Sequence, residues 1–439
     1  MYDAIVIGAG MSGLMGANIL SRTGRRVLVL ERQPRIGGML QGFSRQGVTF
    51  NTGLHYVGGL GPGESLEWLF RYHGLLDLPW VRCDAGEEVV LNGTSFLVPC
   101  GSDFVAGMAR QFPGQEPALR AYEKALRAVC GHIRDLSFDR QPLYGRSAAS
   151  FLEETVPDPL LRKVLSSMGM RTALRPESLS FYEYAQIHGS FLQSAWRLDG
   201  PSSLPAETLA EQIRARGGEI RTGAAVTGIA SGRVRTAEEC YEAPVILSTL
   251  LPSATVALTE DLRDSYRRRV AALETTSGVF TLHLSLDSQR IPYVNHGISL
   301  DGKVFIHQGP ASQMEIIVPV SDWPAGRGAD YEKWKADMAA DALDRAETRF
   351  PGLRTAVQAQ YTSSPLTWER FTGSASAFGV RKDCRSVLTT VLSPRTPVEG
   401  LYLAGQSIGL HGLLGVSMGV LAALGTMYGK EMIQNEFAI

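Results

Sequence analysis

The stretch Ala4-Ile-Val-Ile-Gly8-Ala-Gly10-Met-Ser-Gly13 decides the fold of this chain, because it sets a short apolar run directly before glycines spaced as GxGxxG. One glycine allows a tight turn from strand to helix, the next lets the backbone approach a pyrophosphate, and the third lets the helix pack on the strand. A second apolar run ends in Glu31, whose carboxylate suits the hydroxyls of a ribose. The sequence therefore predicts a dinucleotide-binding βαβ unit.

A second pair of glycines, Gly37-Gly38, follows Glu31-Arg32 after a short interval. The pair comes where the chain would return to the pyrophosphate after leaving the ribose. An extended flavin dinucleotide needs backbone along more of its length than a nicotinamide dinucleotide does, so we expect FAD. In this half of the site the predicted FAD-binding residues are Gly8, Gly10, Gly13, Glu31, Arg32, Gly37 and Gly38.

These segments resemble the FAD-dependent oxidoreductases of the phytoene desaturase, carotenoid isomerase and retinol saturase type, which share their flavin domain with the monoamine oxidases. The resemblance continues in Gly53-Leu-His-Tyr56 and in Gly405-Gln-Ser-Ile-Gly-Leu-His411, which look most like retinol saturases. The fold class that it implies is α/β, with a Rossmann-type FAD-binding domain and an inserted substrate domain of mixed β-sheet and helices.

The C-terminal stretch carries the second strong signal. Gly400–Gln406 predicts a buried strand with a glycine turn, and an apolar helix follows. The resemblance implies that this helix begins around Gly415-Val416 and points N–H groups at the pyrimidine edge of the flavin, and that the backbone of Val226 holds the adenine. Many flavoproteins of this fold have an acid where Gln406 stands, but an amide still hydrogen-bonds a ribityl hydroxyl. The further predicted FAD-binding residues are Val226, Gly405, Gln406, Gly415 and Val416.

Patterning along the chain predicts the other elements. Asn92-Gly93 predicts the turn of a hairpin over Val89–Val98, because it supplies the positive φ angles that such a turn needs. Helical periodicity covers 102–138 and 150–170, and alternation after residue 256 indicates antiparallel strands. We expect an FAD-binding domain over 1–75, 200–255 and 398–439, and a substrate or cap domain over 76–199 and 256–397.

Composition narrows the class of protein and its location. Lys and Arg together number 43 against 44 acids, a balance that argues against a nucleic-acid partner. The cysteines are five and scattered, which suits a reducing compartment. The chain opens on a strand, so we expect no signal peptide and a cytoplasmic location. The apolar segments 66–80 and 413–428 predict buried helices, and a peripheral membrane contact stays open.

His55 and His411 are the catalytic candidates, with Tyr56 as a weaker candidate for the pocket wall. Both histidines lie in segments that resemble the flanks of the flavin, where a histidine supplies a proton or donates a hydrogen bond. The alternative is that each merely caps a turn. No metal-ligand cluster is evident, and no cysteine follows Cys384, so we expect no metal and a noncovalent FAD.

The leading hypothesis is an FAD-dependent oxidoreductase that saturates, desaturates or isomerises C=C bonds of an apolar polyene or isoprenoid-like substrate by hydride transfer at flavin N5. The sequence does not identify the electron donor or acceptor. Two alternatives remain: a flavin amine oxidase, and a non-enzymatic prenyl-binding protein similar to the GDP-dissociation inhibitors. The intact glycine set with Glu31 argues against the second.

Overall fold

The computed structural model describes the whole chain except residues 131–140, 168–170, 172–173, 310–311 and 438–439. The predicted βαβ unit opens a five-stranded parallel sheet of order β10-β2-β1-β14-β20. Its strands are β1 (Ala4–Ile7), β2 (Val27–Leu30), β10 (Glu219–Arg221), β14 (Val245–Ser248) and β20 (Leu401–Leu403). The apolar run before the first glycine is thus the central strand, and all four of its residues are buried.

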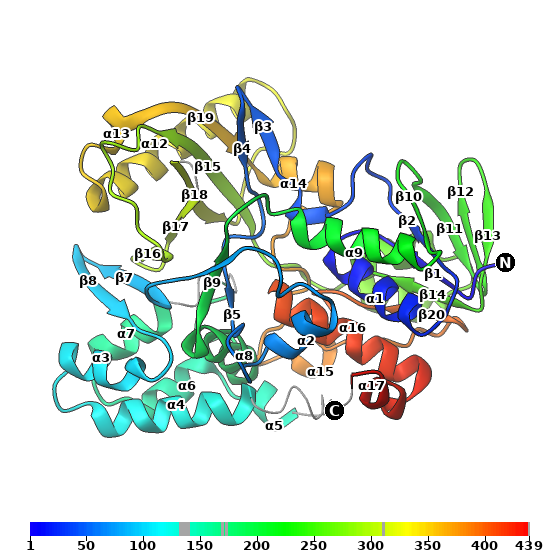
Figure 1. Cartoon of the computed structure of the whole chain (residues 1–439), viewed down its shortest axis with the longest axis horizontal. Helices are drawn as coiled ribbons and strands as arrows, with labels where there is room; N and C mark the ends of the chain where they lie inside the picture. Colours follow the sequence, from blue (N-terminus) through cyan, green and yellow to red (C-terminus); the bar gives the residue numbers. More distant parts are fainter. Residues whose placement is uncertain (131–140, 168–170, 172–173, 310–311, 438–439) are drawn as a thin grey trace.

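Both faces of this sheet are covered, as a parallel sheet requires. Ala4 and Val6 belong to one apolar core, whereas Ile5 and Ile7 belong to another, because successive side chains of a strand point to opposite faces. On one face α1 contacts α9 and α16, and Figure 1 shows the three side by side. The covering elements are α1 (Met11–Arg22), α9 (Leu204–Ala215), α16 (Gly412–Tyr428) and α17 (Lys430–Phe437) on this face, and β11 (Val226–Ala230), β12 (Arg233–Thr236), β13 (Cys240–Glu242), α10 (Pro252–Leu258) and α11 (Asp264–Ala271) on the other.

A seven-stranded sheet of order β19-β15-β18-β17-β16-β7-β8 forms the second layer, seen at the upper left of Figure 1. It is mixed, since β16 pairs with β7 in parallel and the other neighbours are antiparallel. The predicted hairpin is confirmed, with Asn92 at φ 48° and Gly93 at φ 79°. Its elements are β7 (Glu87–Leu91), β8 (Thr94–Val98), β15 (Gly278–Leu286), β16 (Ile298–Leu300), β17 (Val304–Gly309), β18 (Gln313–Val320) and β19 (Val357–Ser363), with α12 (Ala329–Arg349) and α13 (Leu353–Ala356) packed on it.

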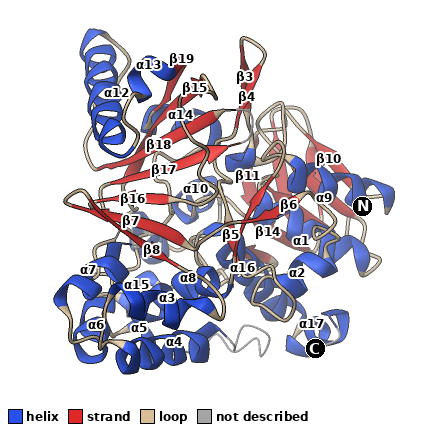
Figure 2. Ribbon diagram, turned by 60° about the vertical axis from the view of Figure 1, so that its left-hand side comes forward, coloured by secondary structure: helices blue, strands red, loops and turns tan. Residues whose placement is uncertain are grey.

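Helices gather below this sheet (Figure 2). The helical periodicity expected over 102–138 is divided, because Pro113-Gly114 interrupts it, and residues 131–138 lie outside the described part. The stretch 150–170 is likewise divided at Pro157, and 168–170 lie outside the described part. These helices are α3 (Asp103–Gln111), α4 (Glu116–Cys130), α5 (Gln141–Tyr144), α6 (Ala148–Thr155), α7 (Pro159–Ser167) and α8 (Phe181–Gln193).

Short elements join the two sheets. The ribbon of β3 and β4 reaches the seven-stranded sheet, where Phe43 lies edge-on to His283 at a centroid distance of 5.0 Å. The connecting elements are η1 (Gly38–Leu40), β3 (Phe43–Arg45), β4 (Val48–Phe50), β5 (Val57–Gly58), α2 (Glu67–Tyr72), β6 (Trp80–Arg82), β9 (Ala195–Leu198), α14 (Pro365–Thr372) and α15 (Val387–Thr390). The predicted α/β fold class is confirmed, and the division into two domains stays a prediction.

The two apolar segments considered for membrane contact pack inside the protein. Leu66, Leu69, Phe70 and Leu75 are fully buried, and α16 is buried along most of its length. Among the described residues, no helix combines the length and apolar character that a bilayer span needs.

Candidate functional site

The carboxyl ends of the parallel strands open into a long pocket. Gly8, Glu31, Thr249 and Ala404 each follow the last residue of a strand, so all four lie at one edge of the sheet and line this pocket. That edge, where strand connections run in opposite directions, is where open α/β sheets bind ligands. Also on its wall are Gly10, Arg32, Gly37, Gly38, Tyr56, Val226, Gln406, His411 and Val416.

Two chain segments approach closely at the glycines. Gly10 and Gly37 form a β-bridge, and the N–H of Gly37 donates to the carbonyl of Ala9 at 2.8 Å. A Cβ on Gly38 would lie 3.1 Å from the Cα of Gly10. The second glycine pair thus returns to the first, as the sequence predicted. The bare backbone leaves a cradle that side chains would fill, and this cradle fits an extended dinucleotide.

Gly13 and Gly405 do not line the long pocket but lie behind its wall. A Cβ on Gly13 would stand 1.9 Å from the carbonyl oxygen of Gly8, so only glycine lets α1 pack against the turn. Gly405 has φ 99° and its carbonyl accepts the N–H groups of Ile408 and Gly409, which makes it the pivot of a turn. Both residues therefore shape the pocket without facing it.

Glu31 is buried, and its carboxylate holds both loops that leave the sheet. Oε2 accepts the N–H of Ala9 at 2.8 Å, and Oε1 accepts the N–H of Gln33 at 2.8 Å. Each oxygen keeps a further lone pair for a ligand hydroxyl. The neighbouring Arg32 is exposed, and its Nη2 donates to the carbonyl of Arg370 at 3.1 Å. Arg32 thereby ties the strand end to α14, and its predicted role in FAD binding stays a prediction.

The C-terminal helix begins earlier than the sequence suggested. α16 starts at Gly412 with His411 as its N-cap residue, so the expected start at Gly415-Val416 is wrong by one turn. There is no room for a side chain at Gly415, because a Cβ there would stand 2.3 Å from the backbone carbonyl carbon of Leu410. The unpaired N–H groups of a helix belong to its first residues, which here come directly after His411.

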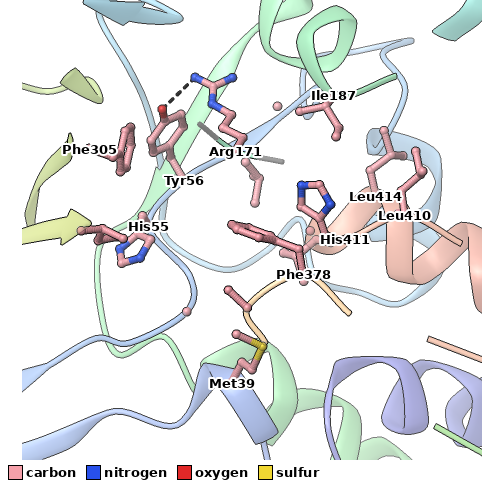
Figure 3. A pocket seen from close by; sticks show the side chains of 18 of the residues that line it. Met39, His55, Tyr56, Arg171, Ile187, Phe305, Phe378, Leu410, His411 and Leu414 are labelled. Atoms are coloured by element: carbon pink, nitrogen blue, oxygen red, sulfur yellow. Dashed lines mark hydrogen bonds between the residues drawn. The ribbon is translucent and has the colours of Figure 1, made fainter. Parts of the chain in front are cut away.

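A second, apolar pocket is shown in Figure 3. It shares Tyr56, Phe378 and His411, among other lining residues, with the long pocket. We call it the apolar pocket. Its walls come from the segment after β4, from α8, from the seven-stranded sheet and from the start of α16. Among the apolar side chains on its wall are Met39, Ile187, Phe305, Trp368, Leu410 and Leu414.

His411 lies where the two pockets meet. Its ring is edge-on to Phe378 at a centroid distance of 4.7 Å, and its Nε2 is buried with no hydrogen-bond partner among the described residues. Burial, together with the nearby Lys382 ammonium, lowers the pKa of His411 to about 3. The imidazole is therefore neutral at physiological pH. Lys382 is itself buried and donates to the carbonyl of Gln406 at 3.0 Å, which holds the turn before α16.

His55 faces the apolar pocket and belongs to a cluster that the sequence did not reveal. One ligand-type atom from each of His55, His307 and Glu315 lies within 4.8 Å of the others. His307 Nδ1 is 3.2 Å from Glu315 Oε2, across the register of β17 and β18. Burial lowers the pKa of His55 to about 4 and raises the pKa of Glu315 to about 7. In this cluster the carboxyl group, not an imidazole, gains or loses a proton near neutral pH, and the imidazoles stay neutral.

Tyr56 is held by residues that no sequence motif indicated. Its hydroxyl accepts a hydrogen bond from Arg171 Nη2 at 2.7 Å (Figure 3). The same guanidinium pairs with buried Glu87. Burial raises the pKa of the Tyr56 hydroxyl, so the phenol stays protonated.

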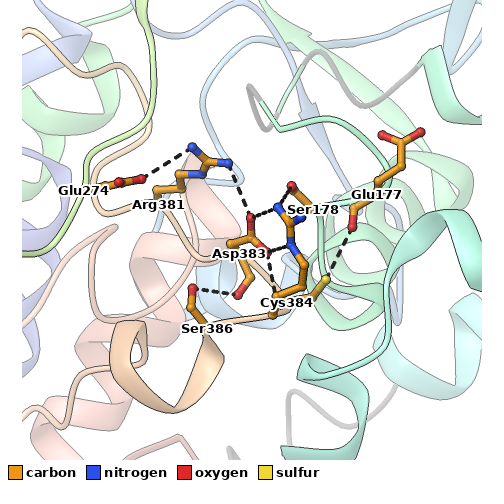
Figure 4. A network of polar contacts seen from close by, with 8 residues as sticks. Glu177, Ser178, Glu274, Arg381, Asp383, Cys384 and Ser386 are labelled. Atoms are coloured by element: carbon orange, nitrogen blue, oxygen red, sulfur yellow. Dashed lines mark hydrogen bonds and ion pairs between the residues drawn. The ribbon is translucent and has the colours of Figure 1, made fainter.

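A polar network fastens the loop that returns from the seven-stranded sheet toward α16 (Figure 4). Asp383 accepts hydrogen bonds from Arg385 at 2.7 Å and from Arg381 at 3.4 Å, and Arg385 also donates to Ser178 at 2.9 Å. Because Asp383 directly follows Lys382, the network also positions the lysine, whose ammonium contacts the turn that leads to His411.

Comparison with known proteins places this geometry in a family. The family described as flavin containing amine oxidoreductase matches residues 11–424, nearly the whole chain. The chain belongs to this family. It is therefore a flavin-dependent oxidoreductase, as the sequence predicted.

Relatives with described activities are distant but cover most of the chain. All-trans-retinol 13,14-reductase of Rattus norvegicus is 24% identical, over 95% of this chain and 84% of its own length. Prolycopene isomerase of Arabidopsis thaliana is 22% identical, over 93% of this chain and 79% of its own. The resemblance to retinol saturases and carotenoid isomerases is confirmed.

Solved structures share the fold. An oxidoreductase from Methanosarcina mazei superposes with a TM-score of 0.69 at 20% identity, covering 96% of this chain and 99% of its own. Cyclohexylamine oxidase from Brevibacterium oxydans gives a TM-score of 0.63 at 18% identity, covering 100% of this chain and 99% of its own.

Proposed function

We propose that this flavoenzyme binds FAD noncovalently and adds hydrogen to, removes it from, or isomerises C=C bonds of an apolar unsaturated chain. The observation that carries the proposal is the shared wall between the glycine-lined long pocket and the apolar pocket. A bound flavin exchanges a hydride at N5 with a carbon of the substrate. Both the retinol reductase and the prolycopene isomerase named above act, by their names, on polyenes.

The chain's own residues would hold FAD along the edge of the parallel sheet. Glu31 is placed for the ribose, the two glycine pairs for the pyrophosphate, and Gln406 for the ribityl chain. The N–H groups at the start of α16 would stabilise negative charge on the pyrimidine ring. No cysteine lines either pocket among the described residues, which supports noncovalent binding.

The apolar pocket excludes water and positions the carbon chain, and the protein must also supply or accept a proton. Adding hydrogen to a C=C bond takes one hydride and one proton. The neutral rings of His55 and His411 are donors of hydrogen bonds rather than charged acids. Glu315, behind His55, is the group that we infer stores the proton.

Amine oxidation is less well supported by the pocket. Among its described lining residues, the only charged side chain is the cation Arg171, which repels an ammonium group.

The proposal is tested by purifying the protein and recording its absorbance spectrum. We expect flavin bands, and we expect FAD to appear in the supernatant after acid precipitation. The chemically reduced enzyme, under anaerobic conditions, should then be reoxidised by all-trans-retinol or a polyunsaturated fatty acid. A colourless protein that does not take up FAD, or an oxidised enzyme that is bleached by cyclohexylamine but indifferent to polyenes, would overturn the proposal.

The stored proton gives a pH dependence with a definite sign. Because the pKa of Glu315 is raised to about 7, the carboxyl is protonated below that pH and loses its proton above it. The rate of reoxidation by a polyene should therefore fall about tenfold for each pH unit above 7. Glu315→Gln should lower the rate and remove the inflection. Glu211→Gln is the control, since this acid is exposed on α9 and lines neither pocket, and it should keep the inflection.

A further inference from the structure

The apolar pocket has one charged group on its wall. Among the described lining residues only Arg171 carries a charge, because the histidines there are neutral. Figure 3 shows its guanidinium at the edge of the ring of side chains, beside the Tyr56 hydroxyl and away from Met39. Burying a cation in an apolar environment costs free energy unless the cation is paired with an opposite charge and its N–H groups are hydrogen-bonded.

The protein satisfies only part of this guanidinium. Nη2 donates to the Tyr56 hydroxyl and to Glu87, and also lies 3.3 Å from the carbonyl of Gly86. Nε and Nη1 are buried and have no hydrogen-bond partner among the described residues. Three of its five N–H groups therefore lack an acceptor. A buried donor without an acceptor costs on the order of 1–3 kcal/mol, and more when it is charged.

Neighbouring groups hold the guanidinium in place and bury most of it. Its Cζ lies 3.7 Å from the ring centroid of Phe191 and 5.0 Å from that of Tyr56. Both rings line the apolar pocket. Glu87 is 1% exposed and holds Arg171 from the side of the protein interior. The cation is thus fixed by aromatic faces and one carboxylate, while Nε and Nη1 are buried without an acceptor among the described residues.

We infer that Arg171, with Tyr56, binds the carboxylate end of the substrate, and that the natural substrate class is an unsaturated long-chain carboxylic acid. A carboxylate supplies two oxygens with several lone pairs and a negative charge, which match the unpaired donors and the charge of the cation. An alcohol offers one oxygen without charge, an ester offers no charge, and an amine is repelled. The chain of the acid would then run along the apolar wall toward His411.

This inference rests on the proposed function, which supplies the reaction at the double bond. Binding of the carboxylate end can be measured separately from that reaction. Trp368 lines the apolar pocket, so its fluorescence reports a ligand even if no flavin is present. The probes are linoleic acid, its methyl ester and linoleyl alcohol, each below its aggregation concentration. We expect the acid to bind the purified protein at least about tenfold more tightly than the ester or the alcohol.

Variants distinguish two roles for Arg171: a group that binds the substrate carboxylate, and one half of an ion pair that only stabilises the fold. Arg171→Gln should weaken binding of the acid about tenfold or more and leave binding of the ester within about threefold. Glu87→Gln should strengthen binding of the acid several-fold, because it removes a competing anion from the guanidinium. An ion pair that serves only the fold predicts no such gain.

Because Arg171→Gln leaves a buried carboxylate unpaired, that single variant can fail to fold. The double variant Arg171→Gln/Glu87→Gln removes both charges and should fold, with equal affinity for acid and ester. Arg171→Lys should restore part of the preference for the acid. Exposed Arg268→Gln is the matched control and should bind like the wild type.

Equal binding of acid and ester by the wild type, or an equal loss for both in the double variant, would overturn the inference. Preference for the acid in a protein that carries no flavin would uphold the carboxylate site while rejecting the proposed function. A yellow enzyme that is reoxidised by retinol but shows no preference for the acid would uphold the proposed function and reject the carboxylate site.

Discussion

Gly13→Ala is expected to abolish flavin binding and to destabilise the protein by roughly 3 kcal/mol or more. The added Cβ would stand 1.9 Å from the carbonyl oxygen of Gly8 and 3.0 Å from its carbonyl carbon. Backbone atoms on both sides of this contact belong to the turn from β1 to α1, so neither side yields without moving the helix away from the central strand. The same turn carries the N–H groups at which the pyrophosphate would bind.

The control for this variant is another helical glycine. Gly425 lies in α16, and apart from its own stretch of helix no described residue has an atom within 4 Å of the position that a Cβ would take. Gly425→Ala should stabilise the protein by about 0.5–1 kcal/mol, because alanine favours the helix more than glycine does. Thermal unfolding and the flavin content per chain are the measurements. A Gly13→Ala protein that melts with the wild type and stays yellow would show that the close packing of α1 is not required.

Glu31→Ala is expected to weaken FAD binding about 100-fold or more while leaving a folded protein. The carboxylate accepts the N–H groups of Ala9 and Gln33, each at 2.8 Å, and is placed at the strand end for the ribose hydroxyls. Hydrogen bonds to a charged group contribute about 1.5–3 kcal/mol each. The variant loses the bonds to the ribose and also loosens the two loops, and the combined free energy corresponds to a loss of affinity of more than about 100-fold.

Titration of the apoprotein with FAD, followed by quenching of flavin fluorescence, measures this effect. Glu31→Gln retains one carbonyl oxygen as an acceptor and should give an intermediate affinity. Glu211→Ala is the matched control, since this acid is exposed on α9 away from the long pocket, and it should bind FAD normally. If all three variants bound FAD equally well, the assignment of Glu31 to the ribose would be wrong.

Local patterns predicted those parts of the fold that neighbouring residues control. The apolar run before Gly8 became a central strand, and Asn92-Gly93 made the predicted turn, because a few consecutive residues determine their own φ and ψ angles. The start of α16 was misplaced because Gly412 and Gly415 are both glycines in the same glycine-rich segment, and local pattern does not tell a helix start from a close tertiary contact. In the structure α16 begins at Gly412, and Gly415 lies inside the helix against the backbone of Leu410.

The same contrast holds for the candidate site. Glu31 and Gly8 could be assigned from the sequence because parallel strands end at one edge, so order along the chain determines proximity. Arg171, Glu87, His307 and Glu315 could not, because no motif surrounds them. His307 meets Glu315 only through the register of β17 and β18.

The sequence by itself determined that this chain has a glycine-turned parallel sheet with an acid at the second strand end, and hence a dinucleotide site of the flavoprotein type. Only the tertiary structure decided which side chains line the apolar pocket, and that the charged Arg171 is among them. The physical reason is that turns and strand ends depend on contacts between near neighbours. The apolar pocket, with Arg171 on its wall, instead arises where sheet register and burial bring together residues far apart in the chain.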